Sequence, residues 1–110
     1  MLKIAMSAAA SGLLRALIAR AGVPRDRILL TDLTSVDWQS LTFIGERHRI
    51  CFRIMGPQSA AVAQRLTHRL QDAEFVIPGQ IVADVALAGE PERCADGSTA
   101  LIIEALTVEE

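Results

Sequence analysis

The sequence has little of the material from which small metal, disulfide or membrane proteins are built. Its 110 residues include two cysteines, one tryptophan, three phenylalanines and no tyrosine. Cys51 and Cys94 are far apart and follow no ligand spacing, which excludes a disulfide framework and a zinc site. No run of about 18 apolar residues occurs, so no membrane span is expected. We expect no metal, no cofactor and no membrane partner.

Charge of one sign does not dominate either, since the net charge is −2 at pH 7. With a single tryptophan near the arginines of residues 47–53, this argues against a nucleic-acid partner. The distribution is less even. Residues 1–72 carry ten Arg or Lys and five Asp or Glu, whereas residues 73–110 carry one Arg and eight Asp or Glu. The two halves should attract, within the fold or between subunits, unless they only form separate solvated faces.

Length and composition indicate one bacterial, cytoplasmic domain. A chain of 110 residues fits a single domain, and ten of its eleven basic residues are Arg, which is typical of a GC-rich bacterial genome. Lys3, the apolar residues 4–14 and Ala19-Arg20-Ala21 loosely resemble a signal peptide. Because the same region forms an amphipathic helix that carries Arg15, we expect a cytoplasmic location.

Two amphipathic helices are predicted. The first begins at Ser7 or Ser11 and ends at Ala21, with Gly22 as a left-handed cap and Pro24 preventing continuation. The second follows the Gly-Pro pair at 56–57, and its apolar arc comprises Val62, Ala63, Leu66, Leu70 and Ala73. For residues 1–6, a frayed helical start and a short edge strand both remain open.

A β-hairpin is predicted over residues 35–55. Gly45-Glu46 suits a two-residue turn, because glycine at the first turn position matches the twist of the flanking strands. This register places Phe43 opposite His48 and Trp38 opposite Arg53.

Further strands precede and follow the hairpin. An extended run at 27–33 continues into it through a bend or bulge near Asp32, and two strands are expected at 80–88 and 99–108, joined by a polar, mobile loop at 89–98. The order α-β-β-α-β-β predicts an α+β two-layer sandwich, with two helices on one face of a four-stranded antiparallel sheet. This arrangement is ferredoxin-like or permuted ferredoxin-like, and such a fold analogy carries little information on function.

Side-chain alternation assigns one sheet face to the helices and leaves the other uncovered. The helices are expected to cover Leu41, Phe43, Ile50, Phe52, Ile81, Val85 and Leu87. The uncovered face is expected to hold a second apolar set: Val36, Trp38, Ile44, Met55, Val82, Ile102, Leu106 and Val108. Because monomers rarely expose so much contiguous apolar surface, we predict a homodimer through the sheet face.

The uncovered face also carries the candidate ligand-binding residues: Trp38, Arg49, Cys51, Arg53, Asp84 and Glu104. Charges inside an apolar interface need partners, so Arg–carboxylate pairs across the sheet are expected. If two such sheets meet imperfectly, they enclose an intersubunit cavity whose arginines could hold a small anionic ligand. A solid interface with satisfied ion pairs and no cavity is the alternative.

No catalytic residue can be assigned from the sequence. His48 and Cys51 are an odd number of positions apart on a strand, so they face opposite sides, and His48 is expected to be a hydrogen-bonded core histidine. Cys51 lies between two arginines, which favour a thiolate nucleophile, but no base is identifiable. Asp84 or Glu104 could act as a general base if desolvated.

The sequence therefore predicts a homo-oligomeric domain with a non-catalytic role in ligand binding or regulatory assembly, with its site at the sheet-face dimer interface. One alternative is a small cofactor-free enzyme that uses the same intersubunit cavity. Another is a structural subunit of a hetero-complex, attracted to its partner by the charge distribution.

Overall fold

A computed structural model of the protein describes residues 6–110. The elements in chain order are α1 (Ala8–Ala21), β1 (Ile28–Gln39), β2 (Ile44–Ile54), α2 (Ser59–Thr67), β3 (Gln80–Leu87), β4 (Glu92–Arg93) and β5 (Thr99–Glu109). Short 3-10 helices lie at Arg25–Arg27 and Leu70–Asp72. The segment 1–6, whose conformation the sequence leaves open, falls outside the described residues except for Met6.

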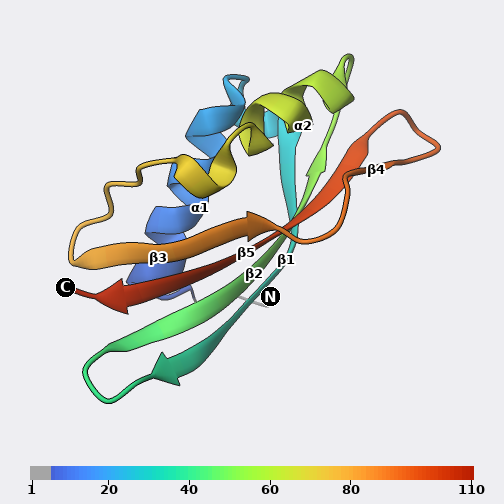
Figure 1. Ribbon diagram of the computed structural model, residues 1–110. Helices are drawn as coiled ribbons and strands as arrows, with labels where there is room; N and C mark the ends of the chain where they lie inside the picture. Colours follow the sequence, from blue (N-terminus) through green and yellow to red (C-terminus); the bar gives the residue numbers. More distant parts are fainter. Residues whose placement is uncertain (1–5) are drawn as a thin grey trace.

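The strands form one antiparallel sheet in the order β1-β2-β5-β3, and β4 pairs with β5 off this path. Both helices pack on the same face of the sheet (Figure 1). The predicted α+β two-layer sandwich is confirmed, with β4 as an additional short strand in the segment expected to be a loop. Because β2 and β3 both pair with β5 and are joined through α2, the strand order is consistent with a permuted ferredoxin-like sandwich.

Helix α1 begins and ends where the sequence predicts. The Ser7 Oγ accepts a hydrogen bond from the Ala10 backbone N–H at 3.1 Å, and Gly22 has a left-handed φ of 68°. A serine cap of this kind stabilises a helix by about 1 kcal/mol. Leu13 and Leu17, on the apolar side of the helix, have no exposed surface. The helix is therefore part of the core.

Helix α2 is shorter than its apolar arc suggests. It ends at Thr67, and Arg69 takes a left-handed φ of 49°, which leads into the 3-10 turn that begins at Leu70. Leu70 is nevertheless buried in the core. The apolar spacing therefore identifies the buried side chain correctly, although the helix does not continue to it.

Two arginines hold chain segments together through carbonyl groups. Arg20 on α1 donates to the Leu66 carbonyl near the end of α2 at 3.0 Å. Arg27, just before β1, donates to the Met55 carbonyl just after β2, also at 3.0 Å. Because these guanidinium groups bind the backbone, part of the positive charge of the N-terminal half serves the fold rather than an ion pair.

The bulge predicted near Asp32 is present. The pairing of β1 with β2 shifts between Leu30 and Asp32, so Thr31 is the extra residue. Its Oγ1 donates to the Cys51 carbonyl at 3.1 Å, which fixes the bulge to the neighbouring strand. The bulge allows Leu30 and Leu33 to face the helices although they are an odd number of residues apart.

The predicted turn of the β1–β2 hairpin is wrong. The loop is residues 40–43, closed by a hydrogen bond from the Ser40 N–H to the Phe43 carbonyl at 2.8 Å, and Trp38 pairs with Gly45 rather than with Arg53. Position 45 lies inside β2. A glycine is required there because a Cβ atom would come within 1.9 Å of the Thr107 carbonyl oxygen on β5. The glycine therefore marks a close approach of two backbones, not a turn.

The shifted register moves three apolar residues out of their predicted places. Leu41 and Phe43, expected under the helices, lie in the exposed loop, and His48 faces Ser35 instead of Phe43. Ile44 is on the helix side of β2, not on the uncovered face, but it lies beyond the cover of the helices and is 60% exposed. Met55, also expected on the uncovered face, follows the last residue of β2 and is therefore not part of the strand.

A second bulge reverses the prediction for β3. The pairing of β3 with β5 shifts between Val82 and Asp84, so Ala83 is the extra residue and the alternation changes at this point. Val82 consequently packs against the core, and Ile81 faces away from the helices opposite Val108. The sequence alternation, read without the bulge, assigns both residues to the wrong face.

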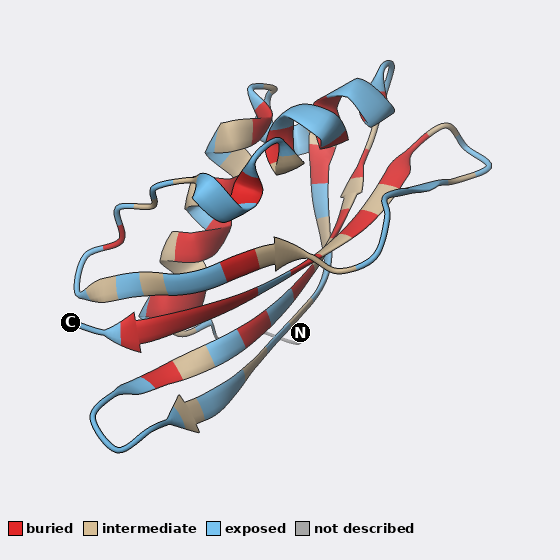
Figure 2. Ribbon diagram, viewed as in Figure 1, coloured by how far each residue is buried: buried red, intermediate tan, exposed pale blue. Residues whose placement is uncertain are grey.

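The core lies between the helices and one face of the sheet. Strand β5 is buried over most of its length, whereas the hairpin loop and the outer surface of α2 are exposed (Figure 2). Ile50, Phe52 and Ile54 from β2 meet the apolar side of the helices in a single cluster. Within residues 6–110, this packing leaves the opposite face of the sheet without a second layer.

Candidate functional site

The sheet face that points away from the helices is called the open face here. The register assigns to it Leu29, Asp32, Thr34, Val36 and Trp38 of β1, Gly45, Arg47, Arg49, Cys51 and Arg53 of β2, Ala100, Ile102, Glu104, Leu106 and Val108 of β5, and Ile81, Asp84 and Ala86 of β3. The predicted ligand-binding residues all lie on this face: Trp38, Arg49, Cys51, Arg53, Asp84 and Glu104.

These six residues do not converge on one cavity in the single chain. Arg49 lies directly opposite Glu104 in the β2–β5 ladder, near the middle of the open face. Trp38 lies at one end, opposite Gly45, and Arg53 lies towards the other end, opposite Ala100. The sequence therefore gives the correct face, but it does not show that the candidates are spread along it.

A hollow of about 220 Å³ lies at the centre of the open face. Its lining includes Arg47, Asp84 and Glu104, together with Ala86. Arg47 is not among the predicted site residues, although its place in the alternation of β2 puts it on the same face as Arg49. Both signs of charge meet here, so the hollow can interact with an anion or with a group of opposite charge on a partner.

The charges of the open face have no close ionic partners among residues 6–110. Among the described residues, the single ion pair within 4.0 Å is Arg69–Asp72, at 3.5 Å, and both of its side chains are exposed. Arg49 and Glu104 thus face each other across two strands without forming a salt bridge. The predicted Arg–carboxylate pairs are not formed between described residues of one chain, nor do the two oppositely charged halves make such a contact.

Arg53 is directed towards the β4–β5 turn. Its Nη2 donates to the Cys94 Sγ at 3.5 Å. In the same turn, the Ser98 hydroxyl and backbone N–H donate to the Asp96 carboxylate and lower its pKa, with a smaller contribution from the Arg53 charge. The segment that the sequence describes as a mobile polar loop is therefore held by β4 and by this turn.

Cys51 lines a second hollow of the open face, of about 200 Å³. Its other walls include Thr31, Ile102 and the acidic side chains Glu90 and Glu92. No histidine lies in this lining, so the hollow offers no partner that could activate the thiol. Cys51 is better described as a small, half-buried residue than as a nucleophile.

His48 is on the helix side of β2, as predicted, and is 2% exposed. Its Nδ1 is 2.8 Å from the Ser35 Oγ and its Nε2 is 2.8 Å from the Thr107 Oγ1, so both ring nitrogens have hydroxyl partners. Burial lowers the pKa of His48, and the nearby Glu46 carboxylate opposes this effect only in part. The side chain joins β1, β2 and β5 from inside the core and is not accessible to a substrate.

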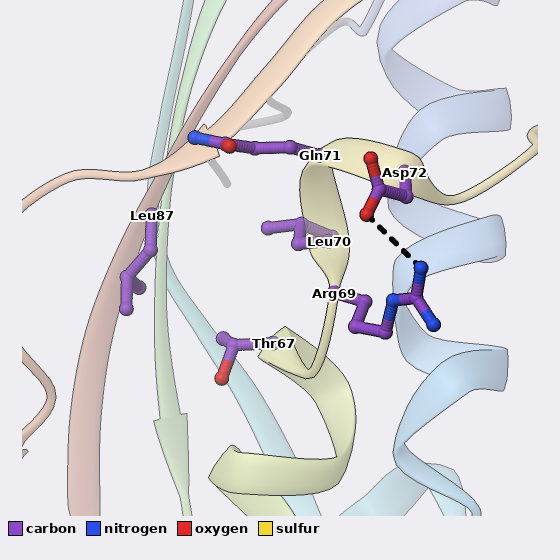
Figure 3. A pocket seen from close by; sticks show the side chains of 6 residues that line it. All are labelled: Thr67, Arg69, Leu70, Gln71, Asp72 and Leu87. Atoms are coloured by element: carbon purple, nitrogen blue, oxygen red, sulfur yellow. Dashed lines mark ion pairs between the residues drawn. The ribbon is translucent and has the colours of Figure 1, made fainter.

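A further hollow, of about 270 Å³, lies on the helix side where α2 ends. Figure 3 shows Leu70 pointing towards β3, where Leu87 lies, and the Arg69–Asp72 ion pair on the other side of the 3-10 turn. Its charged residues are exposed and already paired with each other. It contains none of the residues that the sequence singles out, and we do not assign a function to it.

No protein-family model matches the sequence, and no curated protein matches it either. Within residues 6–110, no group of three or more His, Cys, Asp or Glu side chains could hold a metal ion. No described helix is long and apolar enough to cross a membrane. The candidate site therefore rests on the geometry and chemistry of the open face.

Proposed function

We propose that the protein is a non-catalytic assembly domain that pairs with a second copy of itself through the open face. The observation that carries this proposal is the apolar surface left on that face. Leu29, Val36 and Ile81 are each about half exposed, and Trp38 and Ile102 keep part of their surface. Leu106 and Val108 are already buried in the single chain, so the exposed apolar groups lie mainly on the outer strands.

The charges of the open face favour one geometry of pairing. On this face β2 carries Arg47, Arg49 and Arg53 but no acid, whereas β5 carries Glu104 but no base. A two-fold axis perpendicular to the strands would lay β2 over the partner's β2 and set arginine against arginine. An axis parallel to the strands, between β2 and β5, would lay β2 over the partner's β5 instead.

The second geometry matches charges and apolar groups together. Arg49 would lie over the partner's Glu104, and Arg47 would be within reach of the partner's Asp84. In the row at the hairpin end, Trp38 would lie over the partner's Ile81. Packed sheets lie about 10 Å apart and cross at about 30°, so these pairs are neighbours rather than atom-to-atom contacts.

The expected binding free energy of this interface is compatible with a stable dimer. A standard interface buries about 800 Å² of each partner, which at about 25 cal/mol per Å² gives a gross term on the order of 40 kcal/mol at most. Polar area and the loss of translational and rotational freedom remove most of it. Buried aromatic residues usually contribute most of what remains, so Trp38 is expected to dominate.

A ligand-binding role is the second candidate, and the hollow lined by Arg47, Asp84 and Glu104 favours it. Closed by a partner, this hollow would become an intersubunit cavity in which Arg47 could bind a small anion. Inorganic phosphate should then raise the melting temperature of the wild type more than that of Arg47→Gln. Equal shifts in the two proteins would remove this role and leave assembly alone.

Light scattering of the intact protein, from high to low micromolar concentration, tests the assembly proposal. We expect a dimer for the wild type, a monomer for Trp38→Arg, and unchanged helix content by circular dichroism in both. Gln64→Arg is the matched control, because it adds the same charge at an exposed position of α2 and should remain dimeric. A wild-type protein that is monomeric throughout this range would contradict the proposal.

A further inference from the structure

The tip of the β1–β2 hairpin carries three exposed apolar side chains. Leu41 is 105% exposed relative to an extended reference, Phe43 is 49% exposed and Ile44 is 60% exposed. These three residues are called the hairpin tip here. Single exposed apolar residues are common on protein surfaces, but three within four positions form a patch.

The fold itself does not require an apolar hairpin tip. The loop is closed by its own polar groups, since the Ser40 Oγ accepts from the Phe43 N–H at 3.1 Å and the Ser40 N–H donates to the Phe43 carbonyl at 2.8 Å. Leu41 is fully exposed, and polar residues are the usual choice in such loops. The loop is thus held in place while its apolar side chains face outwards.

A matching hollow lies at the start of β3. It measures about 360 Å³, and its walls include Phe75, Val76, Ile77 and Ile81. Val76 is 94% exposed, so an apolar group is also uncovered here. This feature is called the edge hollow.

The β1–β2 loop and the start of β3 are at the same end of the sheet (Figure 1). Trp38 pairs with Gly45, Gly45 with Val108, and Val108 with Ile81, so these residues form one row across the four strands. In the row beyond it, the Glu110 N–H donates to the Gly79 carbonyl at 3.1 Å. The loop that follows Trp38 is therefore level with the turn that precedes Ile81.

Within one chain the two features cannot meet. The hairpin tip joins β1 to β2 and the edge hollow lies at the start of β3, so two to three strand spacings of about 4.8 Å, or roughly 10–14 Å, separate them. The two-fold axis proposed above lays β1 over the partner's β3. A loop that continues β1 then extends over the partner's residues 76–81.

We propose that Leu41 and Phe43 of each hairpin tip dock into the edge hollow of the other copy. This inference rests on the proposed dimer and specifies how its ends are closed. A membrane surface is a less suitable occupant for the tip, because Asp37 and Glu46 face each other at its base and would be repelled by anionic lipid. A second copy offers an apolar receiving surface at the correct level of the sheet.

Chemical cross-linking tests the contact directly. In a protein with Cys51→Ser and Cys94→Ser, which removes both native thiols, Leu41→Cys and Val76→Cys are made separately and mixed with a short bis-maleimide. A covalent dimer is expected from the mixture and not from either variant alone. Leu41→Cys mixed with Gln64→Cys is the control, because position 64 is exposed on α2, outside the proposed interface.

The outcomes separate this inference from the proposed function. A dimer by light scattering without the cross-link overturns the docking of the tip and leaves the open-face dimer standing. Cross-linking of Leu41→Cys alone also overturns it, since two tips would then meet each other. A monomeric wild type overturns both.

A thermodynamic cycle gives an independent measurement in the native-cysteine protein. Leu41→Ser and Val76→Ser should each raise the dimer dissociation constant about tenfold, and the double variant should show less than the product of the two effects. The melting temperature of the isolated monomer should stay unchanged for Leu41→Ser, because this side chain is fully exposed. A dissociation constant that does not respond to Leu41→Ser overturns the proposal.

Discussion

Strand β2 presents two different chemistries on its two sides. On the helix side, Ile50, Phe52 and Ile54 are fully buried, and the buried polar residue, His48, has a hydroxyl partner for each ring nitrogen. On the open face the alternate positions are three arginines and Cys51, and none of the arginines forms a salt bridge with a described residue.

The covered side is complete without help from another molecule. No buried side-chain nitrogen or oxygen of the described residues lacks a hydrogen-bond partner. The open face combines half-exposed apolar residues with charges that are adjacent but form no salt bridge with any residue that the structure describes. The difference teaches that the core uses only one side of the sheet. The residues on the other side can therefore serve association instead of stability.

The largest expected effect is a loss of stability, and it is tested on two neighbouring residues that lie on opposite sides of β2. Phe52→Ala should lower the free energy of unfolding by about 3–5 kcal/mol, because it leaves a cavity in the core. Cys51→Ala, one position away on the open face, should change it by less than about 1 kcal/mol. Denaturant unfolding of both variants measures the contrast, and equal losses would mean that the open face is also part of the core.

A charge exchange tests whether the open face supplies the association. Arg49→Glu should raise the dimer dissociation constant by about 10–100-fold, because it sets two carboxylates against each other across the proposed interface. The double variant Arg49→Glu/Glu104→Arg should recover most of the affinity. Analytical ultracentrifugation gives both constants, and a double variant as weak as the single one would exclude the proposed axis.

The pH dependence of stability tests the covered side. Burial holds the pKa of His48 below its ordinary value of 6.5, so the unfolded chain binds more protons as the pH falls through that value. Stability should therefore decrease from pH 7.5 to pH 5.5, by at most about 1.4 kcal/mol per pH unit for this group, until the folded pKa is reached.

Two variants assign this pH effect to one histidine. His68→Gln, on the exposed surface, should keep the slope, whereas His48→Gln should lose it even if the protein is less stable at all pH values. Denaturant midpoints over the pH range provide the measurement. A slope that survives in His48→Gln would assign it to another group.

The smallest effect is expected for Arg53→Ala. Pairing with a buried carboxylate would make its removal cost about 3 kcal/mol, but Arg53 instead donates to the Cys94 sulfur and is half buried. We expect a loss of about 1 kcal/mol from unfolding measurements on the Trp38→Arg background, which is expected to be monomeric. A loss near about 3 kcal/mol would mean that Arg53 has an ionic partner in the folded protein.

The parts of the fold that follow local rules could be predicted from the sequence. Ser7 and Gly22 mark the ends of α1 because a cap and a left-handed residue act within one turn. The alternation is predicted correctly for β2 from Arg47 to Ile54 and for β5 over its whole length, so Arg49, Cys51, Arg53 and Glu104 share the predicted face. The bulge near Asp32 could also be located.

The errors arise from contacts between distant segments. Gly45 has the local signature of a turn, but it is a glycine because the Thr107 carbonyl of β5 lies against it. The bulge at Ala83 leaves no local signal and reverses Ile81 and Val82. The direction of Arg53 depends on a turn that lies some forty residues later in the chain. None of these could be read from spacing alone.

The two bulges have a consequence for how the sheet ends. Thr31 interrupts β1 and Ala83 interrupts β3, and these are the outer strands of the main four-strand path. An uninterrupted outer strand offers an even row of backbone donors and acceptors to any passing chain, and a bulge breaks that row. Both margins of the sheet are thus made poor templates for a fifth long strand. Growth into a ribbon or fibre is disfavoured, which leaves the open face as the surface for the proposed dimer.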